Sequence, residues 1–271
     1  MHHSRAILLW VQFDGTDFAG FQRQADGIRS VGGALEQAWL TKFGERVVMR
    51  SSSRTDAGVH AERMPVLVRT DCRVPPKGAM LGLNAFLPDD CKVHDAEERP
   101  TEFDVRSDAV GKRYLYRVHA GPVKLPLLRR HVWLVKGKLD VPAMQRAAQH
   151  WVGIHDFAAF RSVQCTAQTT VRHMRDITVT ENRDAVEITV DGNAFLHNMV
   201  RIMAGTLVSI GRGRLPIEAA AQMLQSGERT HGGQTAPAVG LTLLDVFFGP
   251  SGARQGTDYK AMLVNMAAAR G

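Results

Sequence analysis

The order of elements along the chain predicts an α+β protein made of two ferredoxin-like α/β sandwich halves with mainly antiparallel sheets. Short runs with period-2 alternation indicate strands, and segments with apolar residues at helical spacing separate them. In the first half this order is β-α-β-β-α-β, the split β-α-β pattern of ferredoxin-like sandwiches. The 271 residues, 44% hydrophobic and 23% charged, suffice for one large domain or two smaller ones.

The first half opens with an alternating strand over residues 5–13, which a polar run ends. A long loop follows to residue 30, and unstructured loops of this length in compact domains are usually functional. The segment 31–43 has apolar residues at helical spacing, and Gly44 supplies a stop. The other elements predicted here are strands over 47–51, 64–69 and 91–97 and a short helix within 77–86.

The second half begins with a long alternating strand over 104–119, in which Tyr114 and Tyr116 share one face. We expect an N-terminal α+β domain over residues 1–105 and a C-terminal α+β domain over residues 106–271. A helix is predicted from Val141 to Trp151, capped by Asp140 and ended by Gly153. A hairpin of strands 176–181 and 185–191 follows, and then a helix after Gly192 whose apolar stripe includes Phe195, Met199 and Ile210. The last elements predicted are a short helix from Pro216 to Gly227 and a strand over 241–248.

The formal net charge of +7 favours a polyanionic partner, because lysine and arginine replace the counterions condensed on phosphates. A generally basic proteome gives the same excess of charge, so net charge alone leaves both explanations open. The motifs in the sequence must therefore indicate whether the partner is a nucleic acid.

The cysteines Cys72, Cys91 and Cys165 are widely spaced and form no C-x-x-C pair, which argues against a disulfide framework or zinc knuckle. The histidines show no ligand spacing, so we expect no metal. No apolar run reaches the roughly 18 residues that span a bilayer, and the first residues lack the pattern of a signal peptide. We therefore expect a cytoplasmic protein that does not associate with membranes.

The segment 52–61 combines an arginine, an aspartate and a glycine between two predicted strands, which is typical of an active-site loop. Strands can hold Asp56 rigidly at a sheet end, and Gly58 permits positive φ and keeps bulk away from a ligand. The alternative is an aspartate in an ordinary turn with Arg54 as a surface partner, because aspartate and glycine are common turn residues.

Four stretches in the same order resemble the tRNA pseudouridine synthase A family over nearly the whole chain. The departures are Ser53 where the family usually has glycine, Phe13 where it often has tyrosine, and Phe21 where it often has tryptophan. The four stretches are residues 13–24 (FDGTDFAGFQRQ), 54–61 (RTDAGVHA), 84–90 together with 103–106 and 112–116, and 193–201 (NAFLHNMVR) followed by 236–241 (APAVGL).

The resemblance implies the pseudouridine synthase fold and the isomerisation of uridine to pseudouridine at positions 38, 39 and 40 of the tRNA anticodon arm. This reaction breaks the C1′–N1 glycosidic bond, turns the freed uracil and rejoins it through C5. No electrons are exchanged, so neither a redox cofactor nor a metal is required. The resemblance also implies a homodimer in which one tRNA crosses both subunits.

The same resemblance assigns three catalytic residues, Asp56, Tyr114 and Arg201. Asp56 matches the nucleophile, which attacks either C1′ of the ribose or C6 of the uracil. Tyr114 matches the tyrosine that stacks on the target base and assists proton removal from C5, although strand tyrosines often serve only packing. Arg201 matches the basic partner of the carboxylate; without the resemblance it is a polar-face arginine of a core helix.

Substrate binding is expected from Tyr114 and from a further set of residues. Leu241 matches the apolar residue that closes the pocket. Arg54 and His60 are expected to contact substrate phosphate or support the loop, and His60 alone also fits a buried structural histidine. Arg23 and Arg161 are expected to bind the tRNA backbone, together with Arg29, Arg106, Lys112, Arg113 and Arg172.

Three other functions remain open at the level of sequence. The same chemistry at other RNA positions would differ only in the docking surface. A tRNA-binding protein without turnover would lack one of the catalytic residues, yet Asp56, Tyr114 and Arg201 are all present. A glycosidase-like hydrolase needs a second carboxylate roughly 5 to 9 Å from Asp56, and no recognisable partner motif supplies one.

Overall fold

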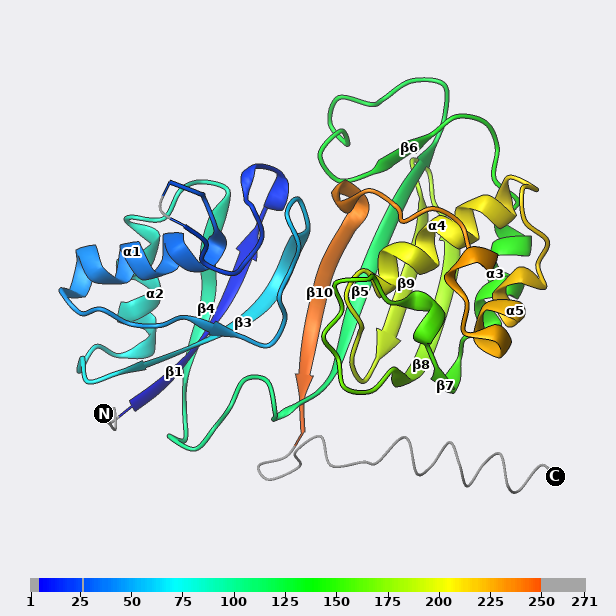
Figure 1. The fold of residues 1–271 in the computed structure, drawn as a ribbon. Helices are drawn as coiled ribbons and strands as arrows, with labels where there is room; N and C mark the ends of the chain where they lie inside the picture. Colours follow the sequence, from blue (N-terminus) through cyan, green and yellow to red (C-terminus); the bar gives the residue numbers. More distant parts are fainter. Residues whose placement is uncertain (1–4, 26, 250–271) are drawn as a thin grey trace. The chain divides into compact units, whose positions relative to one another are not determined.

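The computed structural model describes residues 5–25 and 27–249 and divides them into two compact units (Figure 1). Unit 1 comprises residues 5–110 and 242–249, and unit 2 comprises residues 111–241. Residues 1–4, which belong to the segment expected not to be a signal peptide, lie outside the described residues.

The strands of unit 1 have the order expected of a ferredoxin-like sheet. β1 (Arg5–Phe13) lies between β4 (Cys91–Arg99) and β3 (His60–Thr70) and is antiparallel to both. The other edge of β3 is shared: β2 (Arg50–Ser51) pairs with it antiparallel, and β10 (Leu241–Phe248) pairs with it in parallel. The split β-α-β arrangement predicted for the first half is confirmed.

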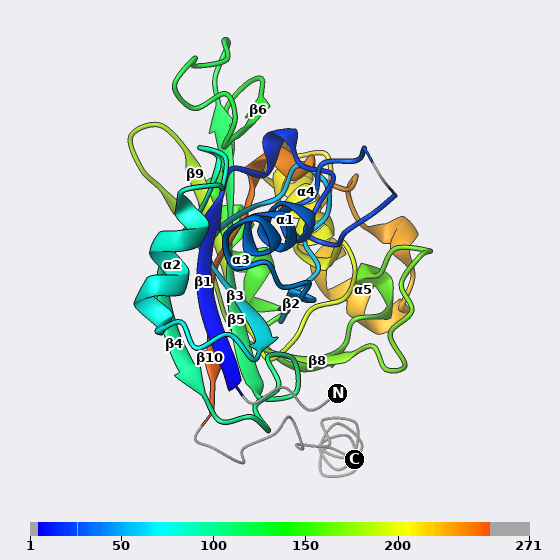
Figure 2. The same ribbon diagram turned by 90° about the vertical axis from the view of Figure 1, so that its left-hand side faces the viewer.

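Two helices lie beside this sheet, as Figure 2 shows. α1 (Val31–Phe43) begins where the Ser30 hydroxyl accepts the N–H of Gly33 and ends at Gly44, whose φ is +70°. α2 (Pro76–Asn84) is tied to β4 because the Asn84 amide bonds both the carbonyl and the N–H of Val93, at 2.7 and 2.9 Å. α1 was predicted from its apolar spacing and the stop at Gly44, and α2 was predicted as a short helix within 77–86.

The core of unit 1 is centred on β1, whose residues from Ala6 to Val11 are buried. A strand covered on both faces reads as a continuous apolar run, and residues 6–11 form such a run in place of the alternation expected for this strand. Phe103 and Val105 join Leu8 and Trp10 in one apolar cluster. The segment after β4 therefore covers part of the sheet and brings residues 104–106 close to β2.

Unit 2 repeats the split arrangement with one additional strand. Its sheet has the order β5-β9-β8-β7, and all neighbours in it are antiparallel. Because a helix connects β5 to the later strands and β9 inserts between β5 and β8, the topology is again ferredoxin-like. The strands are β5 (Ala109–Ala120), β6 (Trp133–Val135), which pairs with β5 in parallel, β7 (Gly153–Asp156), β8 (Val171–Glu181) and β9 (Val186–Gly192).

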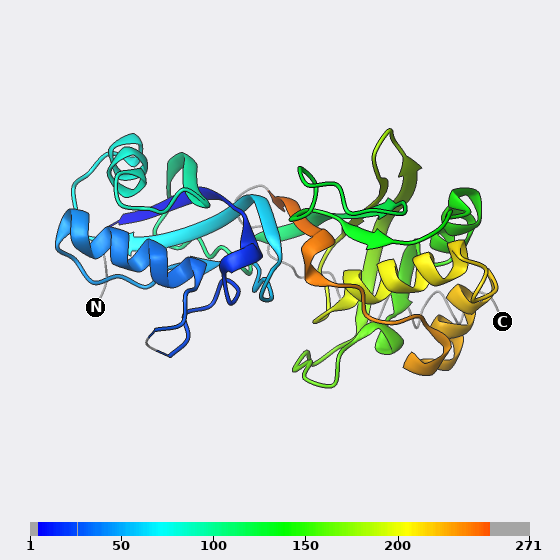
Figure 3. The same ribbon diagram turned by 90° about the horizontal axis from the view of Figure 1, so that it is seen from above.

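Three α-helices belong to unit 2: α3 (Val141–Gln149), α4 (Met199–Gly211) and α5 (Ala219–Ser226). The segment 234–240 lies against α4, as Figure 3 shows. A Cβ at Gly205 would lie 1.7 Å from the carbonyl oxygen of Gln234, so this approach requires glycine. Short 3-10 helices complete the fold at Gly15–Asp17, Ala158–Phe160, Arg229–His231 and Ala238–Gly240.

Several predicted boundaries were wrong for identifiable reasons. The strand predicted from 104 starts at Ala109, because the Asp104 carboxylate accepts the N–H groups of Arg106 and Ser107 and forms a turn. The helix predicted after Gly192 starts at Met199, so Phe195 lies before it. β6 and β7 were not predicted, because three or four residues are too few to show alternation.

Among the described residues, no helix combines the length and the apolar character that crossing a bilayer requires. All three helices of unit 2 are shorter than the roughly 20 residues that such a crossing takes.

Candidate active site

Asp56 lies half-buried on the loop between β2 and β3, residues 52–59, which we call the Asp56 loop. The carbonyl of Asp56 accepts the N–H of Val59 at 3.2 Å, which closes a tight turn over Ala57 and Gly58. Gly58 has a φ of +78°, a conformation that strains any residue with a Cβ. The turn therefore fixes the backbone of Asp56 and requires the glycine two residues later.

A second loop, residues 14–24, packs against the Asp56 loop through backbone atoms. The N–H of Phe21 donates to the carbonyl of Thr55 at 3.2 Å, and the N–H of Gly58 donates to the carbonyl of Phe18 at 3.3 Å. A Cβ at Gly20 would lie 2.6 Å from the Thr55 carbonyl oxygen. The long loop is therefore part of the scaffold that holds Asp56.

His60 joins the two loops from the inside and is only 2% exposed. Its Nδ1 accepts the N–H of Gly15 at 3.0 Å, and an Asp14 carboxylate oxygen lies 3.2 Å from the same nitrogen. A ring nitrogen that accepts an N–H carries no proton, so in this tautomer Nδ1 donates nothing to Asp14. Of the roles expected for His60, its burial favours support of the loop over contact with phosphate.

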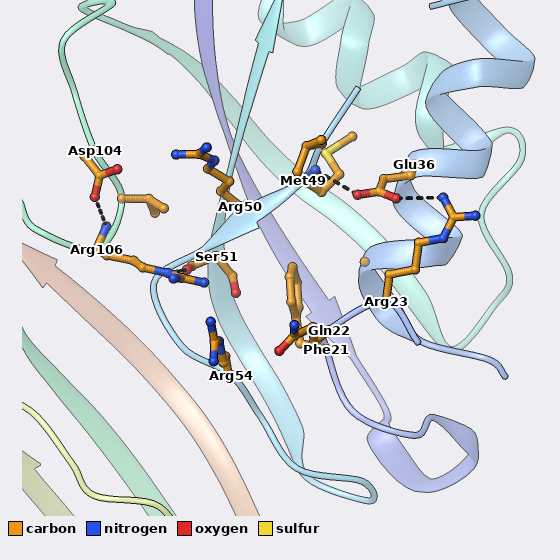
Figure 4. A pocket seen from close by; sticks show the side chains of 13 residues that line it. Phe21, Gln22, Arg23, Glu36, Met49, Arg50, Ser51, Arg54, Asp104 and Arg106 are labelled. Carbon is orange, nitrogen blue, oxygen red and sulfur yellow. Dashed lines mark hydrogen bonds and ion pairs between the residues drawn. The ribbon is translucent and has the colours of Figure 1, made fainter. Parts of the chain in front are cut away.

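Beside the Asp56 loop, unit 1 contains a pocket of about 490 Å³, which we call the arginine pocket. It is bounded by the loop 14–24, α1, β2 and the segment 104–106 (Figure 4). Arg23 and Arg54, which the sequence assigned to substrate binding, both line it. The structure thus brings these two residues into one cavity with Arg106, a third arginine expected to bind tRNA, and with Arg50, which the sequence did not single out.

Tyr114 belongs to unit 2, where it lies on β5 opposite Val190 of β9 and is 9% exposed. Its ring meets that of Phe195 edge to face, with centroids 5.0 Å apart and an interplanar angle of 80°. This geometry is favourable for aromatic pairs and restricts the orientation of the tyrosine ring. Phe195 therefore acts as a wall for Tyr114 rather than as part of a helix stripe.

Arg201 lies half-buried in the first turn of α4, in unit 2. Its Nε donates to the carbonyl of Ala236 at 2.7 Å, and its Nη1 donates to Oδ1 of Asn198 at 2.8 Å. Asn198 has a φ of +64° and is the one non-glycine residue with positive φ in the described part of the chain. Two acceptors from different segments therefore fix the guanidinium.

Arg161 is exposed on the segment that follows the 3-10 helix Ala158–Phe160. Its neighbour Ser162 is bound twice to His197: the N–H of Ser162 donates to the His197 carbonyl at 3.2 Å, and the Ser162 hydroxyl lies 2.7 Å from Nδ1. The loop that carries Arg161 is thereby tied to the start of α4. No pattern in the sequence predicts this pair, since its members lie 35 residues apart and no spacing rule links them.

Leu241 is the first residue of β10 and is 7% exposed. The segment before it is packed closely in unit 2, because a Cβ at Gly240 would lie 2.7 Å from the carbonyl oxygen of Arg117. The buried Tyr116 hydroxyl donates to the carbonyl of Pro237 at 2.7 Å. These contacts fix the backbone that leads into Leu241.

Other arginines expected to bind tRNA are engaged with the protein itself. Arg29 forms two bonds with the Asp90 carboxylate, at 2.6 and 2.7 Å. Arg113 donates to Asp191 at 2.9 Å, and Arg172 is buried and donates to backbone carbonyls of its own strand region. These contacts support a structural contribution to the fold.

The expected site residues are thus divided between the units. Unit 1 contains Asp56, Arg54, His60 and Arg23. Unit 2 contains Tyr114, Arg201, Leu241 and Arg161. Within residues 5–25 and 27–249, no three histidine, cysteine, aspartate or glutamate side chains are grouped so as to hold a metal ion.

Comparison with known proteins adds independent information. A family model described as tRNA pseudouridine synthase matches residues 147–249. The tRNA pseudouridine synthase A of Pelobacter propionicus is 46% identical over 244 residues, which cover 90% of this chain and 100% of that protein. The protein of the same name from Geotalea uraniireducens is 43% identical, again over 90% of this chain and all of the relative.

A solved structure titled "Crystal Structure of a Cbf5-Nop10-Gar1 Complex" is similar at a TM-score of 0.33 and 13% identity, covering 75% of this chain and 45% of that one. Similarity at this level is too low to support an inference about the present chain.

Proposed function

The chain belongs to the tRNA pseudouridine synthase A family and is an isomerase that forms pseudouridine, and from this premise we propose that its substrates are uridines 38, 39 and 40 of the tRNA anticodon arm. The observation that carries the proposal is the 46% identity over 90% of the chain, which includes the Asp56 loop. The net charge of +7 and the arginine pocket support a nucleic-acid substrate.

In the proposed reaction Asp56 is the nucleophile and attacks either C1′ of the ribose or C6 of the uracil. The C1′–N1 bond breaks, the uracil turns, and a C5–C1′ bond forms while C5 loses a proton and N1 gains one. The turn closed by Val59 and the packing of residues 14–24 support this assignment, since a nucleophile must be held in a fixed position.

The proposal assigns the other roles to residues of unit 2. Tyr114 stacks on the target base and assists removal of the C5 proton, and its edge-to-face contact with Phe195 supports a fixed ring orientation. Arg201 provides the positive charge that keeps a reacting carboxylate ionised, and Leu241 closes the apolar side of the site. Arg54, Arg23 and Arg161 bind the RNA backbone, whereas His60 supports the loop.

A stacked uridine must be flipped out of the anticodon arm before it can react, and unstacking costs a few kcal/mol. Contacts between arginines and the RNA backbone must supply that free energy. We further propose that the enzyme works in the cytoplasm as a homodimer, because a chain of this size needs a second copy to reach along a tRNA. A monomer by sedimentation at micromolar concentration would contradict the dimer.

The test compares the wild-type enzyme with Asp56→Ala on a tRNA transcript that carries uridines at positions 38, 39 and 40. Pseudouridine is mapped at each position by carbodiimide modification and primer extension. We expect product at these positions with the wild type only, because removal of the carboxylate eliminates the covalent step.

The outcomes separate the alternatives. Product at other positions keeps the chemistry and changes the substrate. Intact binding of tRNA by the wild type without product would indicate a binding protein, and release of uracil would indicate a hydrolase. Product from Asp56→Ala at the wild-type rate would remove Asp56 from the mechanism.

A further inference from the structure

The arginine pocket concentrates positive charge at one place in unit 1. Of its lining residues, Arg50, Arg54 and Arg106 surround the end of β2, as Figure 4 shows. Arg106 enters from the segment after β4, where its Nε donates to the carbonyl of Ser51 at 3.1 Å. Residues from two distant segments thus place three guanidinium groups around one cavity.

The electrostatics of Arg106 report directly on this crowding. Burial lowers the pKa of Arg106, and the nearby cations Arg54 and Arg50 lower it further, while Asp104 opposes the shift. Cations that lower the pKa of Arg106 lie close to it in a medium that screens their charges incompletely. An anion placed among them would relieve this repulsion.

The two carboxylates that line the pocket are committed to the protein. Glu36 accepts the N–H of Met49 at 3.1 Å and binds Arg23 at 3.3 Å. Asp104 accepts the backbone N–H groups of Arg106 and Ser107, at 3.0 and 2.9 Å. With four arginines and two acidic residues in the lining, the pocket keeps an excess of positive charge.

The chemistry of the lining selects a phosphate over a nucleobase. Guanidinium groups match the geometry of phosphate oxygens and bind them through paired hydrogen bonds. A base would need an exposed aromatic face to stack on, but the one aromatic lining residue, Phe21, is 4% exposed. A set of cations without a stacking surface is suited to a phosphodiester group.

We propose that Arg50 and Arg106, together with Arg54, form a subsite for a phosphate of the RNA backbone next to the target nucleotide. The inference rests on the proposed function, since it takes the ligand to be RNA. Arg54 precedes Asp56 by two residues, a distance of at most about 7 Å along the chain. The phosphate bound here is therefore close to the reacting nucleotide, and its capture holds the strand while the base leaves the stack.

The experiment measures binding of a tRNA transcript by the full-length protein at several salt concentrations. The variants are Arg50→Gln, Arg106→Gln and their combination, and the control is Arg73→Gln, an exposed arginine that does not line the pocket. We expect the double variant to lower the magnitude of the slope of log K against log salt by about 1, as expected for loss of one phosphate contact, and the affinity by roughly tenfold at low salt. The control should change the affinity less than twofold.

Two comparisons among these and one further variant guard against misfolding. Arg50→Gln leaves the bond between Arg106 and Ser51 in place, so a change of slope in this variant cannot come from loss of that bond. Arg50→Lys combined with Arg106→Lys keeps both charges and should retain most of the slope. Unchanged slopes in all glutamine variants, or an equal loss in Arg73→Gln, would overturn the proposal.

Inorganic phosphate distinguishes RNA from a free anion as the source of the ligand. Phosphate should stabilise the wild type against unfolding more than chloride of equal ionic strength does. This difference should disappear in the double variant. Such stabilisation with an unchanged RNA slope would assign the pocket to free phosphate and overturn the RNA subsite. If the wild type forms pseudouridine but the slope of the double variant is unchanged, the subsite alone is overturned. If RNA binding depends on the pocket but the wild type forms no pseudouridine, the proposed function alone is overturned.

Discussion

Unit 1 and unit 2 hold their candidate catalytic residues by different physical means. The Asp56 loop is fixed by backbone hydrogen bonds and by glycines that let two chain segments approach closely. Arg201 is fixed by its own side chain, which donates to Ala236 and Asn198. An added side-chain atom at one of these glycines would therefore displace the Asp56 loop. The position of Arg201 depends instead on two particular hydrogen bonds.

This difference explains the composition of the two motifs. Residues 13–24 contain glycines where the Asp56 loop passes, because a side chain would occupy the space of its carbonyl oxygens. Residues 193–201 contain polar side chains, because Asn198 and His197 form the contacts that position their neighbours. The residue types in each motif therefore follow from how the motif is held: by close approach of backbones in residues 13–24 and by side-chain hydrogen bonds in residues 193–201.

The largest effect is expected from Gly15→Ala in unit 1. The new Cβ would lie 2.0 Å from the carbonyl oxygen of Val59, so the two loops must separate. We expect a loss of about 3 kcal/mol in stability, typical of overpacking against backbone. Pseudouridine formation should also fall by roughly 100-fold or more, because Asp56 moves with the loop.

The matched control is Gly27→Ala, on the same loop region. Gly27 has a φ of +87° with no heavy atom within 4 Å of a built Cβ, so only backbone strain of about 1 kcal/mol is expected. Chemical denaturation and rate measurements on both variants check the comparison. Equal losses of stability and activity in the two variants would show that the Asp56 loop is not held by its close approach to residues 14–24.

An intermediate effect is expected from changes to the support of Arg201 in unit 2. Arg201→Lys keeps the charge and loses the forked geometry, so we expect a fall in kcat of about 30-fold. Asn198→Gly keeps the positive φ but removes the acceptor 2.8 Å from Nη1, and a fall of about tenfold is expected.

Stability measurements separate positioning from folding in this case. Asn198→Gly should change the melting temperature little, because relief of strain offsets the lost hydrogen bond. Full activity in Asn198→Gly would show that the side-chain support of Arg201 is not needed.

The smallest effect is expected from Tyr116→Phe, compared with Tyr114→Phe on the same strand. Burial raises the pKa of Tyr116, so its hydroxyl stays protonated and donates to Pro237. Its removal leaves a buried carbonyl without that donor, which should cost about 1 to 2 kcal/mol while activity persists.

Tyr114→Phe should show the reverse behaviour. Its hydroxyl has a proposed role in proton removal, so activity should fall with little change in melting temperature. Thermal unfolding and turnover measured side by side check this pair. A loss of activity in Tyr116→Phe as large as in Tyr114→Phe would contradict the division between a structural and a catalytic tyrosine.

Elements with local signals were predictable from the sequence. α1 was predicted at its observed bounds, since its apolar spacing is bracketed by Ser30 and Gly44. β10 was predicted at its observed bounds as well, because it is long and strongly apolar. Nearby residues determine these features, so the local pattern contains the needed information.

Elements that depend on distant neighbours were predicted less well. β2 shrinks to two residues because its pairing is set by the edge of β3 that it shares with β10. β7 forms because β8 offers a partner, and Gly153 with a φ of +110° opens it rather than ending the preceding helix. Pairing across the sheet overrides short-range propensity in both cases.

By itself the sequence determined the two α+β halves, the family motifs and the identity of the candidate catalytic residues. Only the tertiary structure decided that His60 is a buried support for Gly15 and that Arg50 shares a cavity with Arg106. The physical reason is that periodicity reports which face of an element is apolar, whereas contacts between segments depend on how their backbones pack. The arginine pocket is a property of that packing and has no signature in any single stretch of the chain.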